Sequence, residues 1–172
     1  MWNTKAFLVL AVILSTLVSC AQEKDTGNET TIYYFIRHAE KDRSDPKNND
    51  PHLTEQGKKR AEKWAAVLKN IPFDAVYSTN YNRTLQTAKP VAAQNNIEIT
   101  FYDPSEFDMN AFKKDTKGKK VLVVGHSNTT PRFVNLLSGT EKYEDIEDDN
   151  NANLYIVTLT GDKVTDMLLK ID

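Results

Sequence analysis

The sequence feature that most constrains the fold is a pair of short apolar runs that each stop beside a histidine. Residues 31–36, TIYYFI, are β-branched or aromatic, and His38 follows them closely. Residues 120–124, KVLVV, lead in the same way to His126. Such runs predict buried strands, and an apolar run without alternation is typical of a central parallel strand. The chain is therefore expected to hold two histidines at strand ends.

Helix and strand signals alternate along the rest of the chain. Thr54 is expected to cap a helix in which Trp64 faces the core, and Pro90 predicts either a kink or a late start of the second helix. Thr130 as N-cap and Gly139 past the end bracket another helix. The predicted helices cover 55–70, 80–96, part of 104–116 and 131–138, and the predicted strands cover 31–36, 73–78, 97–103, 120–124, 153–159 and 163–171.

Alternating strands and helices predict a three-layer α/β/α sandwich with a mostly parallel central sheet. Ligands bind such sheets beyond the carboxyl ends of the strands. Arg37 and His38 follow one predicted strand, His126 follows another, and Arg83 lies one helical turn after a third. The sequence thus predicts two histidines and two arginines on one rim.

This set of side chains suits phosphoryl transfer. The planar guanidinium groups of two arginines match phosphate oxygens. A histidine kept neutral by this positive surrounding could attack phosphorus, while the other histidine donates to a phosphoryl oxygen. A covalent phosphohistidine would divide the reaction into two easier steps.

Four sequence blocks resemble the histidine phosphatase superfamily, whose fold is phosphoglycerate mutase-like. They are RHAEK at 37–41, LTEQGKKRA at 53–61, STNYNRTLQTA at 78–88 and VVGHSN at 123–128. The blocks follow the family order over residues 32–137, which makes the resemblance specific. The short chain resembles the phosphatase branch, because mutases usually carry insertions that enclose a sugar-acid phosphate.

The resemblance implies a catalytic set without cofactor or metal. By this correspondence His38 is the nucleophile, and Arg37, Arg83 and His126 form the phosphate pocket. Lys41 and Asn128 are added as phosphate-binding candidates, although Lys41 could equally point to solvent.

Two small residues, Gly125 and Ala39, lie next to the predicted catalytic histidines. The resemblance implies that Gly125 lets the backbone turn close to the ligand. Ala39 stands where the family usually has glycine.

The general acid is the least defined residue. Family phosphatases often use a Glu or Asp after the third strand, in the segment that reads YDPSEFDMNAF here. By spacing from Arg83, Asp108 is favoured, followed by Glu106 and Asp103. The alternative is that all three are surface carboxylates, and short members without an obvious acid tend to act on good leaving groups or on phosphohistidine in proteins.

Other functions fit the sequence less well. GHSNT resembles the Gly-x-Ser-x-Gly elbow of serine hydrolases, but Thr129 replaces its second glycine and no histidine follows Ser127. A metallohydrolase is disfavoured because the histidines lack ligand spacing, and His52 is expected to be a loop residue. A phosphomutase of the same family, or a catalytically weak protein that binds a phosphate ligand, remains an alternative.

The acidic run EKYEDIEDDNNAN at 141–153 could be read as a calcium loop. Asp149, Asn151 and Asn153 alternate as in an EF-hand, but Leu154 occupies the position of the required glycine. A solvated loop that borders the mouth of the site is the preferred interpretation.

The N-terminus predicts export. Residues 1–19 have one basic residue, an apolar run and small residues, as in a signal peptide, and LVSC resembles a bacterial lipobox. This implies a lipid on Cys20, a polar tether over 20–30 and a phosphatase-like domain over 31–172. The expected location is the bacterial cell envelope, as a periplasmic or outer-membrane lipoprotein bound to the membrane through its lipid.

Composition limits the partners. The formal net charge is −2 over 172 residues, so a nucleic-acid partner is not expected. The expected partner is a small phosphorylated substrate or a phosphoprotein, and the chain is expected to be a monomer.

Overall fold

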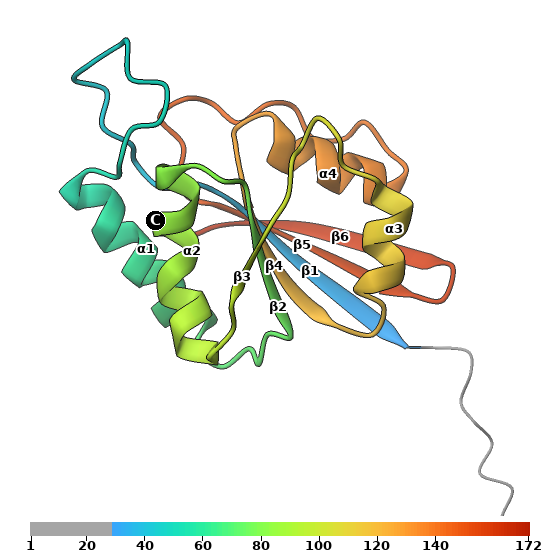
Figure 1. Ribbon diagram of the computed structural model, residues 1–172. Coiled ribbons are helices and arrows are strands. Elements are labelled where there is room, and N and C mark those ends of the chain that lie inside the picture. Colours follow the sequence, from blue (N-terminus) through green and yellow to red (C-terminus); the bar gives the residue numbers. More distant parts are fainter. Residues whose placement is uncertain (1–28) are drawn as a thin grey trace, which may run out of the picture.

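A computed structural model describes residues 29–172 (Figure 1). The predicted signal peptide and Cys20 lie outside the described residues. Between residues 29 and 172, no helix has the length and apolar character needed to cross a membrane. The elements are β1 (Thr30–Arg37), α1 (Glu55–Leu68), β2 (Ala75–Ser78), α2 (Asn82–Asn95), β3 (Ile99–Phe101), α3 (Met109–Asp115), β4 (Lys120–Gly125), α4 (Thr129–Ser138), β5 (Asn153–Thr160) and β6 (Lys163–Lys170).

The strands form one six-stranded sheet in the order β3-β2-β4-β1-β5-β6. The four strands β3, β2, β4 and β1 are parallel, while β5 runs antiparallel to β1 and forms a hairpin with β6. Helices cover both faces, α1 and α2 on one and α3 and α4 on the other (Figure 1). The predicted three-layer sandwich with a mostly parallel sheet is confirmed.

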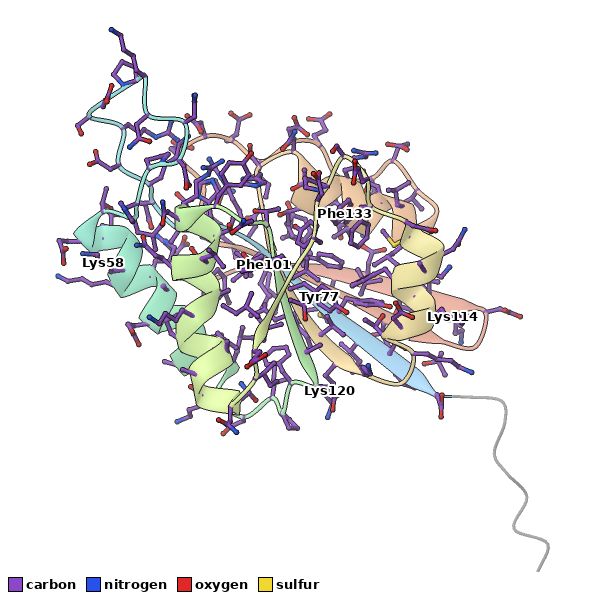
Figure 2. All side chains as sticks on the ribbon, in the orientation of Figure 1. Lys58, Tyr77, Phe101, Lys114, Lys120 and Phe133 are labelled. Atoms are coloured by element: carbon purple, nitrogen blue, oxygen red, sulfur yellow. The ribbon has the colours of Figure 1, made fainter. Side chains whose placement is uncertain are left out.

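Alternation along β1 explains why the sheet needs two helical layers. Tyr34 and Ile36 belong to the core under α1 and α2, whereas Tyr33 and Phe35 belong to the core under α3 and α4. Successive side chains of a strand point to opposite faces, so a strand that is apolar throughout must be covered twice. Figure 2 shows side chains filling both layers. Trp64 is buried under α1, as predicted.

Of two predicted helix N-caps, the structure confirms one and corrects the other. Thr54 caps α1 as predicted, its hydroxyl accepting from the Gly57 N–H. The cap of α4 is Asn128, whose side chain accepts from the Thr129 N–H, so the prediction of Thr130 was wrong by two residues. Asparagine is as good an N-cap as threonine or better, which the choice of Thr130 overlooked.

The second predicted helix is continuous through its proline. α2 begins at Asn82 and includes Pro90, so a late start is wrong. Its C-cap, Asn96, is left-handed with φ 54°. Gly139 ends α4 with φ 67°, as predicted. Asparagine and glycine tolerate this conformation and commonly stop helices.

Candidate active site

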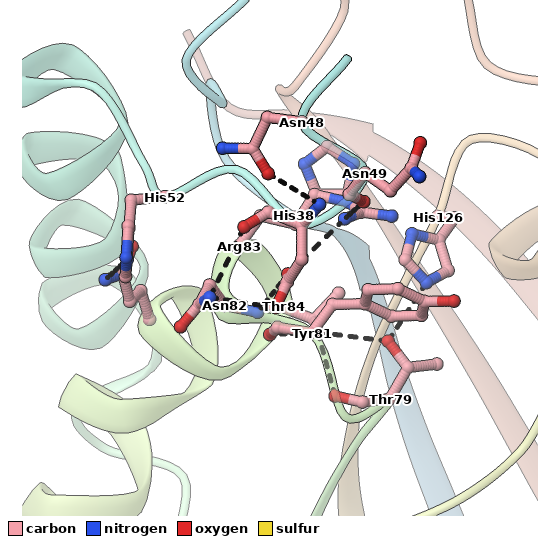
Figure 3. A network of polar contacts seen from close by, with 12 residues as sticks. His38, Asn48, Asn49, His52, Thr79, Tyr81, Asn82, Arg83, Thr84 and His126 are labelled. Atoms are coloured by element: carbon pink, nitrogen blue, oxygen red, sulfur yellow. Dashed lines mark hydrogen bonds and ion pairs between the residues drawn. The ribbon is translucent and has the colours of Figure 1, made fainter. Parts of the chain in front are cut away.

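Parallel pairing of β1 with β4 brings the two histidines together. Arg37 is opposite Gly125 in the register, and the His38 N–H donates to the Gly125 carbonyl at 2.9 Å. The imidazole rings of His38 and His126 meet edge to face with centroids 5.6 Å apart. Figure 3 shows both rings beside Arg83 at the N-terminal end of α2. The two strand-end histidines therefore belong to one cluster.

The ring of His38 is oriented by the main chain. Its Nδ1 lies 2.8 Å from the Ala39 carbonyl oxygen. Because a carbonyl only accepts, Nδ1 must carry the proton, and Nε2 of the neutral ring keeps its lone pair. Burial, together with the positive charge of Arg37, lowers the pKa of His38 to about 3. His38 is thus a neutral imidazole at pH 7 with a free Nε2.

The block LTEQG holds the loop that carries His38. The Thr54 N–H donates to the Glu40 carbonyl at 2.9 Å. A Cβ at Gly57 would lie 2.2 Å from the same carbonyl oxygen, so only glycine lets α1 approach this closely. The first turn of α1 therefore rests directly on the peptide of Glu40, two residues beyond His38.

Two side chains fix the rest of this loop. The Ala39 N–H donates to Thr87 Oγ1 at 2.9 Å, and Asn151 Nδ2 donates to the His38 carbonyl at 2.8 Å. Ala39 is fully buried in a small cluster with Leu53 and Ala61. The alanine in the RHAEK block thus replaces the usual glycine with a packed methyl group.

Arg37 is held by the acidic loop. The side chain is only 3% exposed. Its Nη1 donates to the carbonyls of Glu147, Asp148 and Asn150 at 2.8, 3.1 and 3.0 Å, and Nη2 donates to Asp148 Oδ1 at 2.9 Å. Nε is buried and has no hydrogen-bond partner among residues 29–172.

Arg83 is held more loosely. Nη1 donates to the Asn49 carbonyl at 3.3 Å and lies 3.8 Å from Asp50 Oδ1. The guanidinium carbon lies 4.4 Å from the centre of the Tyr81 ring. Nε of Arg83 is also buried, again without an acceptor in the described part of the chain. Buried donors rarely lack an acceptor, and the charges of both arginines act on His38.

Asp50 connects the loop before α1 to this arginine. Tyr81 occupies the N-cap position of α2 but gives no side-chain hydrogen bond there. Asp50 Oδ1 instead accepts from the Asn82 N–H at 2.7 Å. A carboxylate at a helix N-terminus is favourable, and this one anchors the start of α2, where Arg83 lies.

His126 is held from the side opposite to the cluster. Its Nε2 lies 3.0 Å from Thr79 Oγ1. The Tyr81 ring meets it edge to face at 5.4 Å. Burial, together with the charges of Arg83, Lys41 and Arg37, lowers the pKa of His126 to about 4. His126 is accordingly neutral at pH 7, and its Nδ1 has no protein partner in residues 29–172.

The two added phosphate candidates differ in position. Burial lowers the pKa of Lys41, and so do the charges of Arg83 and Arg43, which places this ammonium beside the cationic cluster. Asn128 is exposed, and its side-chain oxygen is occupied by the cap of α4, 2.9 Å from the Thr129 nitrogen. Contact of either residue with phosphate stays a prediction.

The predicted acids lie outside the hydrogen-bond network of the cluster. Asp108 is exposed and caps α3, accepting from the N–H groups of Asn110 and Ala111 at 2.8 and 3.1 Å. Asp103 accepts from Ser105, and Glu106 is exposed. None of the three forms a hydrogen bond or ion pair with the histidines or arginines of the cluster within residues 29–172, so an acid role remains a prediction.

A cavity of about 280 Å³ opens beside His38. The acidic loop forms one wall, as expected for a loop at the mouth of the site. The loop is not simply solvated, because Asn151 is buried and bound to His38. The cavity is lined by His38, Glu40, Lys41, Arg43, Gln56, Arg60, Asp148, Asp149 and Asn151.

Gly125 serves packing. A Cβ there would lie 2.9 Å from the hydroxyl oxygens of both Thr130 and Tyr102. The glycine does not adopt positive φ. The expectation that Gly125 lets the backbone turn close to a ligand stays a prediction, and the contacts seen at this glycine are with two hydroxyl groups.

His52 is a loop residue, as predicted. It is exposed, and its Nδ1 accepts from Gln86 Nε2 at 2.8 Å, apart from His38 (Figure 3). No group of three or more His, Cys, Asp or Glu side chains within residues 29–172 could hold a metal ion.

Sequence reasoning missed five residues that hold the cluster. Thr79, Tyr81 and Thr87 belong to the STNYNRTLQTA block, so the motif contained the signal but not the roles. Asp148 and Asn151 come from the acidic run, where composition suggested only solvation. Their roles depend on contacts between residues far apart in the sequence. Asn151, for example, bonds to His38 across a sequence separation of 113.

The fold and the site define a phosphoglycerate mutase-like α/β protein with two histidines and two arginines. The family model of the histidine phosphatase superfamily (branch 1) matches residues 33–104. This range contains three of the four sequence blocks, and the fourth is placed beside them by β4. Over this range the chain is similar to the histidine phosphatase superfamily, and solved structures share its phosphoglycerate mutase-like fold. A search of curated proteins gives no significant match.

Solved structures share the fold at low sequence identity. A protein described as the phosphohistidine phosphatase SixA of Agrobacterium tumefaciens is 21% identical with a TM-score of 0.62, over 83% of this chain and 99% of that one. Phosphoglycerate mutase of Bacillus anthracis is 14% identical with a TM-score of 0.66, over 85% of this chain and 95% of that one. A protein described as an α-ribazole-5′-phosphate phosphatase of Escherichia coli is 13% identical with a TM-score of 0.65, over 81% of this chain and 96% of that one.

Proposed function

We propose that this protein is a metal-independent phosphatase that works through a phosphohistidine on His38. The observation that carries the proposal is the pairing of two features within residues 29–172. One is a neutral imidazole with a free Nε2, and the other is a pair of buried arginine Nε–H groups that lack acceptors. A phosphoryl group beside His38 would supply acceptors for both arginines. Phosphoryl transfer depends mainly on such positioning and charge stabilisation.

In the first step, the lone pair of His38 Nε2 attacks phosphorus. The new P–N bond forms as the P–O bond to the leaving group breaks, and the leaving group takes that electron pair. Arg37 and Arg83 donate to the equatorial oxygens, and His126 lies on the same side. The hydrogen bond from Nδ1–H to the Ala39 carbonyl stabilises the positive charge that develops on the ring of His38.

In the second step, water attacks the phosphohistidine. The P–N bond breaks, its electron pair returns to Nε2, and inorganic phosphate leaves with the oxygen of water. His38 is thereby restored as the neutral ring held by Ala39. The arginines retain the same role because the same phosphoryl oxygens are present in both steps.

The substrate we propose is a phosphate monoester or a phosphoprotein with a good leaving group. None of the three predicted acids is joined to the cluster by a hydrogen bond in the described residues, which favours leaving groups that need little protonation. One structural neighbour is described as a phosphohistidine phosphatase, which supports this class.

A phosphomutase is the second candidate, because a mutase shares the fold. A mutase would return the phosphoryl group from His38 to a second hydroxyl of the substrate. Supplying a phosphorylated enzyme with a sugar-acid acceptor distinguishes the two: we expect inorganic phosphate, whereas transfer to the acceptor would favour the mutase. A protein that binds phosphate with little turnover is a third candidate, which the turnover assay tests.

The experiment that tests the proposal measures turnover of an aryl phosphate by residues 29–172. We expect hydrolysis that survives EDTA and is lost in His38→Ala. Wild-type turnover in that variant would contradict the nucleophile assignment, and loss of turnover in EDTA, restored by a divalent metal, would contradict metal independence. The exposed His52→Ala variant is the matched control.

We also propose that the domain is held at the bacterial cell envelope by a lipid on Cys20. β1 begins at Thr30 and the site lies at its other end, so an N-terminal anchor would leave the site facing away from the attachment. Cys20→Ala in the full chain should release the protein from membranes. Retention on membranes would contradict a lipid anchor.

A further inference from the structure

Behind His126 lies a chain of two buried threonine hydroxyls. Thr79 Oγ1 lies 3.0 Å from His126 Nε2 and 3.0 Å from Thr84 Oγ1. Thr84 Oγ1 in turn lies 2.8 Å from the Thr79 carbonyl and 2.9 Å from the Tyr81 carbonyl. Thr79 and Thr84 are both fully buried. Figure 3 shows Thr79 beside His126, with the chain leading back to the start of α2.

The direction of this chain follows from counting protons. The Thr84 hydroxyl has one proton, and its carbonyl neighbours can only accept. That proton therefore goes to a carbonyl, and Thr84 Oγ1 accepts from Thr79. The single proton of Thr79 is then used, so Thr79 Oγ1 must accept from His126. Nε2 of His126 consequently carries a proton, and Nδ1 is the bare nitrogen of the neutral ring.

We propose that Thr79 and Thr84 are positioning residues that lock His126 as the Nε2–H tautomer and so present Nδ1 to the phosphoryl group. The tautomer itself depends only on the contacts above. The role of Nδ1 toward a phosphoryl oxygen rests on the proposed function.

The surroundings of His126 explain why a locked tautomer matters. The charged groups that act on the ring are Arg83, Lys41 and Arg37, and the rings of His38 and Tyr81 meet it edge to face. Burial and these cations lower the pKa of the ring and keep it neutral while no anion is bound. A bound phosphoryl group adds negative charge, so Nδ1 can take up a proton and donate it to a phosphoryl oxygen. Because Nε2 stays bonded to Thr79, the added proton can reside only on Nδ1.

The test is the protonation of the imidazole nitrogens in residues 29–172, measured by long-range ¹H–¹⁵N NMR at pH 7. The wild type should show the Nε2–H tautomer for His126, as should Thr79→Ser, which keeps the hydroxyl. Thr79→Val removes the acceptor, and Thr84→Val frees the Thr79 proton to point at Nε2. Both valine variants should shift His126 toward the Nδ1–H tautomer.

Thr116→Val is the matched control, because it removes a buried hydroxyl that bonds to Tyr33 in the other layer. It should leave the His126 tautomer unchanged. An Nδ1–H tautomer in the wild type, or an unchanged tautomer in both Thr79→Val and Thr84→Val, would overturn the proposal.

Orthovanadate, a phosphate mimic, separates this proposal from the proposed function. On vanadate binding, we expect both nitrogens of His126 to be protonated in the wild type. Vanadate affinity should fall about tenfold in Thr79→Val, the effect of roughly one hydrogen bond to a charged group, and recover in Thr79→Ser. An Nε2–H tautomer with no protonation of Nδ1 on vanadate binding would overturn the role of Nδ1. Absent turnover alongside the expected NMR result would contradict the proposed function only.

Discussion

The two histidines of the cluster are hydrogen-bonded through opposite ring nitrogens. His38 gives Nδ1–H to a backbone carbonyl and leaves Nε2 free, whereas His126 is bonded at Nε2 and leaves Nδ1 free. Burial lowers the pKa of both, to about 3 and about 4. The difference lies in the partner: His38 relies on the main chain, and His126 relies on a threonine side chain.

This difference indicates how each ring responds to change. The carbonyl that orients His38 belongs to the next residue and is fixed by Thr87 and by the packing of Gly57 on Glu40. The partner of its Nδ1 is a backbone atom, which no substitution removes. The orientation of His126 depends on the Thr79 hydroxyl, so one substitution can release it. His38 is thus the more firmly held of the two rings.

The largest expected effect separates the two histidines directly. His38→Ala should lower kcat by at least about 10⁴-fold, as when a nucleophile is removed. His126→Ala should lower it by about 10²- to 10³-fold, as when one transition-state donor is removed. Steady-state kinetics with an aryl phosphate measures both. Equal losses in the two variants would contradict the division of roles.

The arginines sharpen the comparison, because they too differ in how firmly they are held. Arg37→Ala leaves three carbonyls of the acidic loop without their donor and should cost about 2–4 kcal/mol of unfolding free energy as well as activity. Arg83→Ala should lower kcat/KM by about 10²-fold with less than about 1 kcal/mol change in stability, since its protein contacts are long.

Urea unfolding and steady-state kinetics test this pair of variants. The loss of stability should be larger in Arg37→Ala than in Arg83→Ala. The reverse order would mean that the loop contacts of Arg37 contribute little.

The low pKa values of His38 and His126 predict that stability falls in acid. Both rings stay neutral in the folded protein down to about pH 4, while in the unfolded chain they take up protons below about pH 6.5. The unfolded state therefore binds more protons, and unfolding free energy decreases as pH falls from about 6.5 toward about 4. Each ring contributes about 1.4 kcal/mol per pH unit in that window.

Urea unfolding at several pH values measures this slope. The double variant His38→Asn/His126→Asn should have a shallower pH dependence than the wild type over the same window. Identical slopes would mean that the two rings are not kept neutral by the fold.

The smallest expected effect concerns Asp108. Asn is as good an N-cap as Asp, so Asp108→Asn keeps the cap of α3 and removes only the acid. Because the carboxylate is exposed and already bonded to the helix, we expect less than about a twofold change on aryl and alkyl phosphates alike, within ordinary variation for a surface position. Selective slowing of alkyl phosphates would instead identify Asp108 as the acid.

Much of the fold could be predicted because the spacing of apolar residues along the sequence indicates where strands and helices lie. The apolar runs of β1 and β4 predicted central strands, and both are buried and adjacent. The carboxyl-end rule then placed His38 and His126 together. Helix ends were harder: Asn128 and Thr130 are two residues apart, and both residue types cap helices well.

The supports of the site could not be predicted from local patterns. The acidic run reads as a solvated loop by composition, yet its backbone carbonyls hold Arg37. Because every residue has a backbone carbonyl, the residue types of the loop do not reveal such contacts. The role of Thr79 depends on which proton each hydroxyl carries, and this follows only from the carbonyls that surround Thr84.

The most direct test of the account is the position of phosphate on the trapped enzyme. A reaction with labelled aryl phosphate, quenched in alkali, should leave phosphate on His38, and NMR of the phosphorylated ring should assign it to Nε2. Phosphate on Nδ1 of His38 would contradict the account because that nitrogen carries the proton bonded to the Ala39 carbonyl. Phosphate on His126 would contradict the assignment of His38 as the nucleophile.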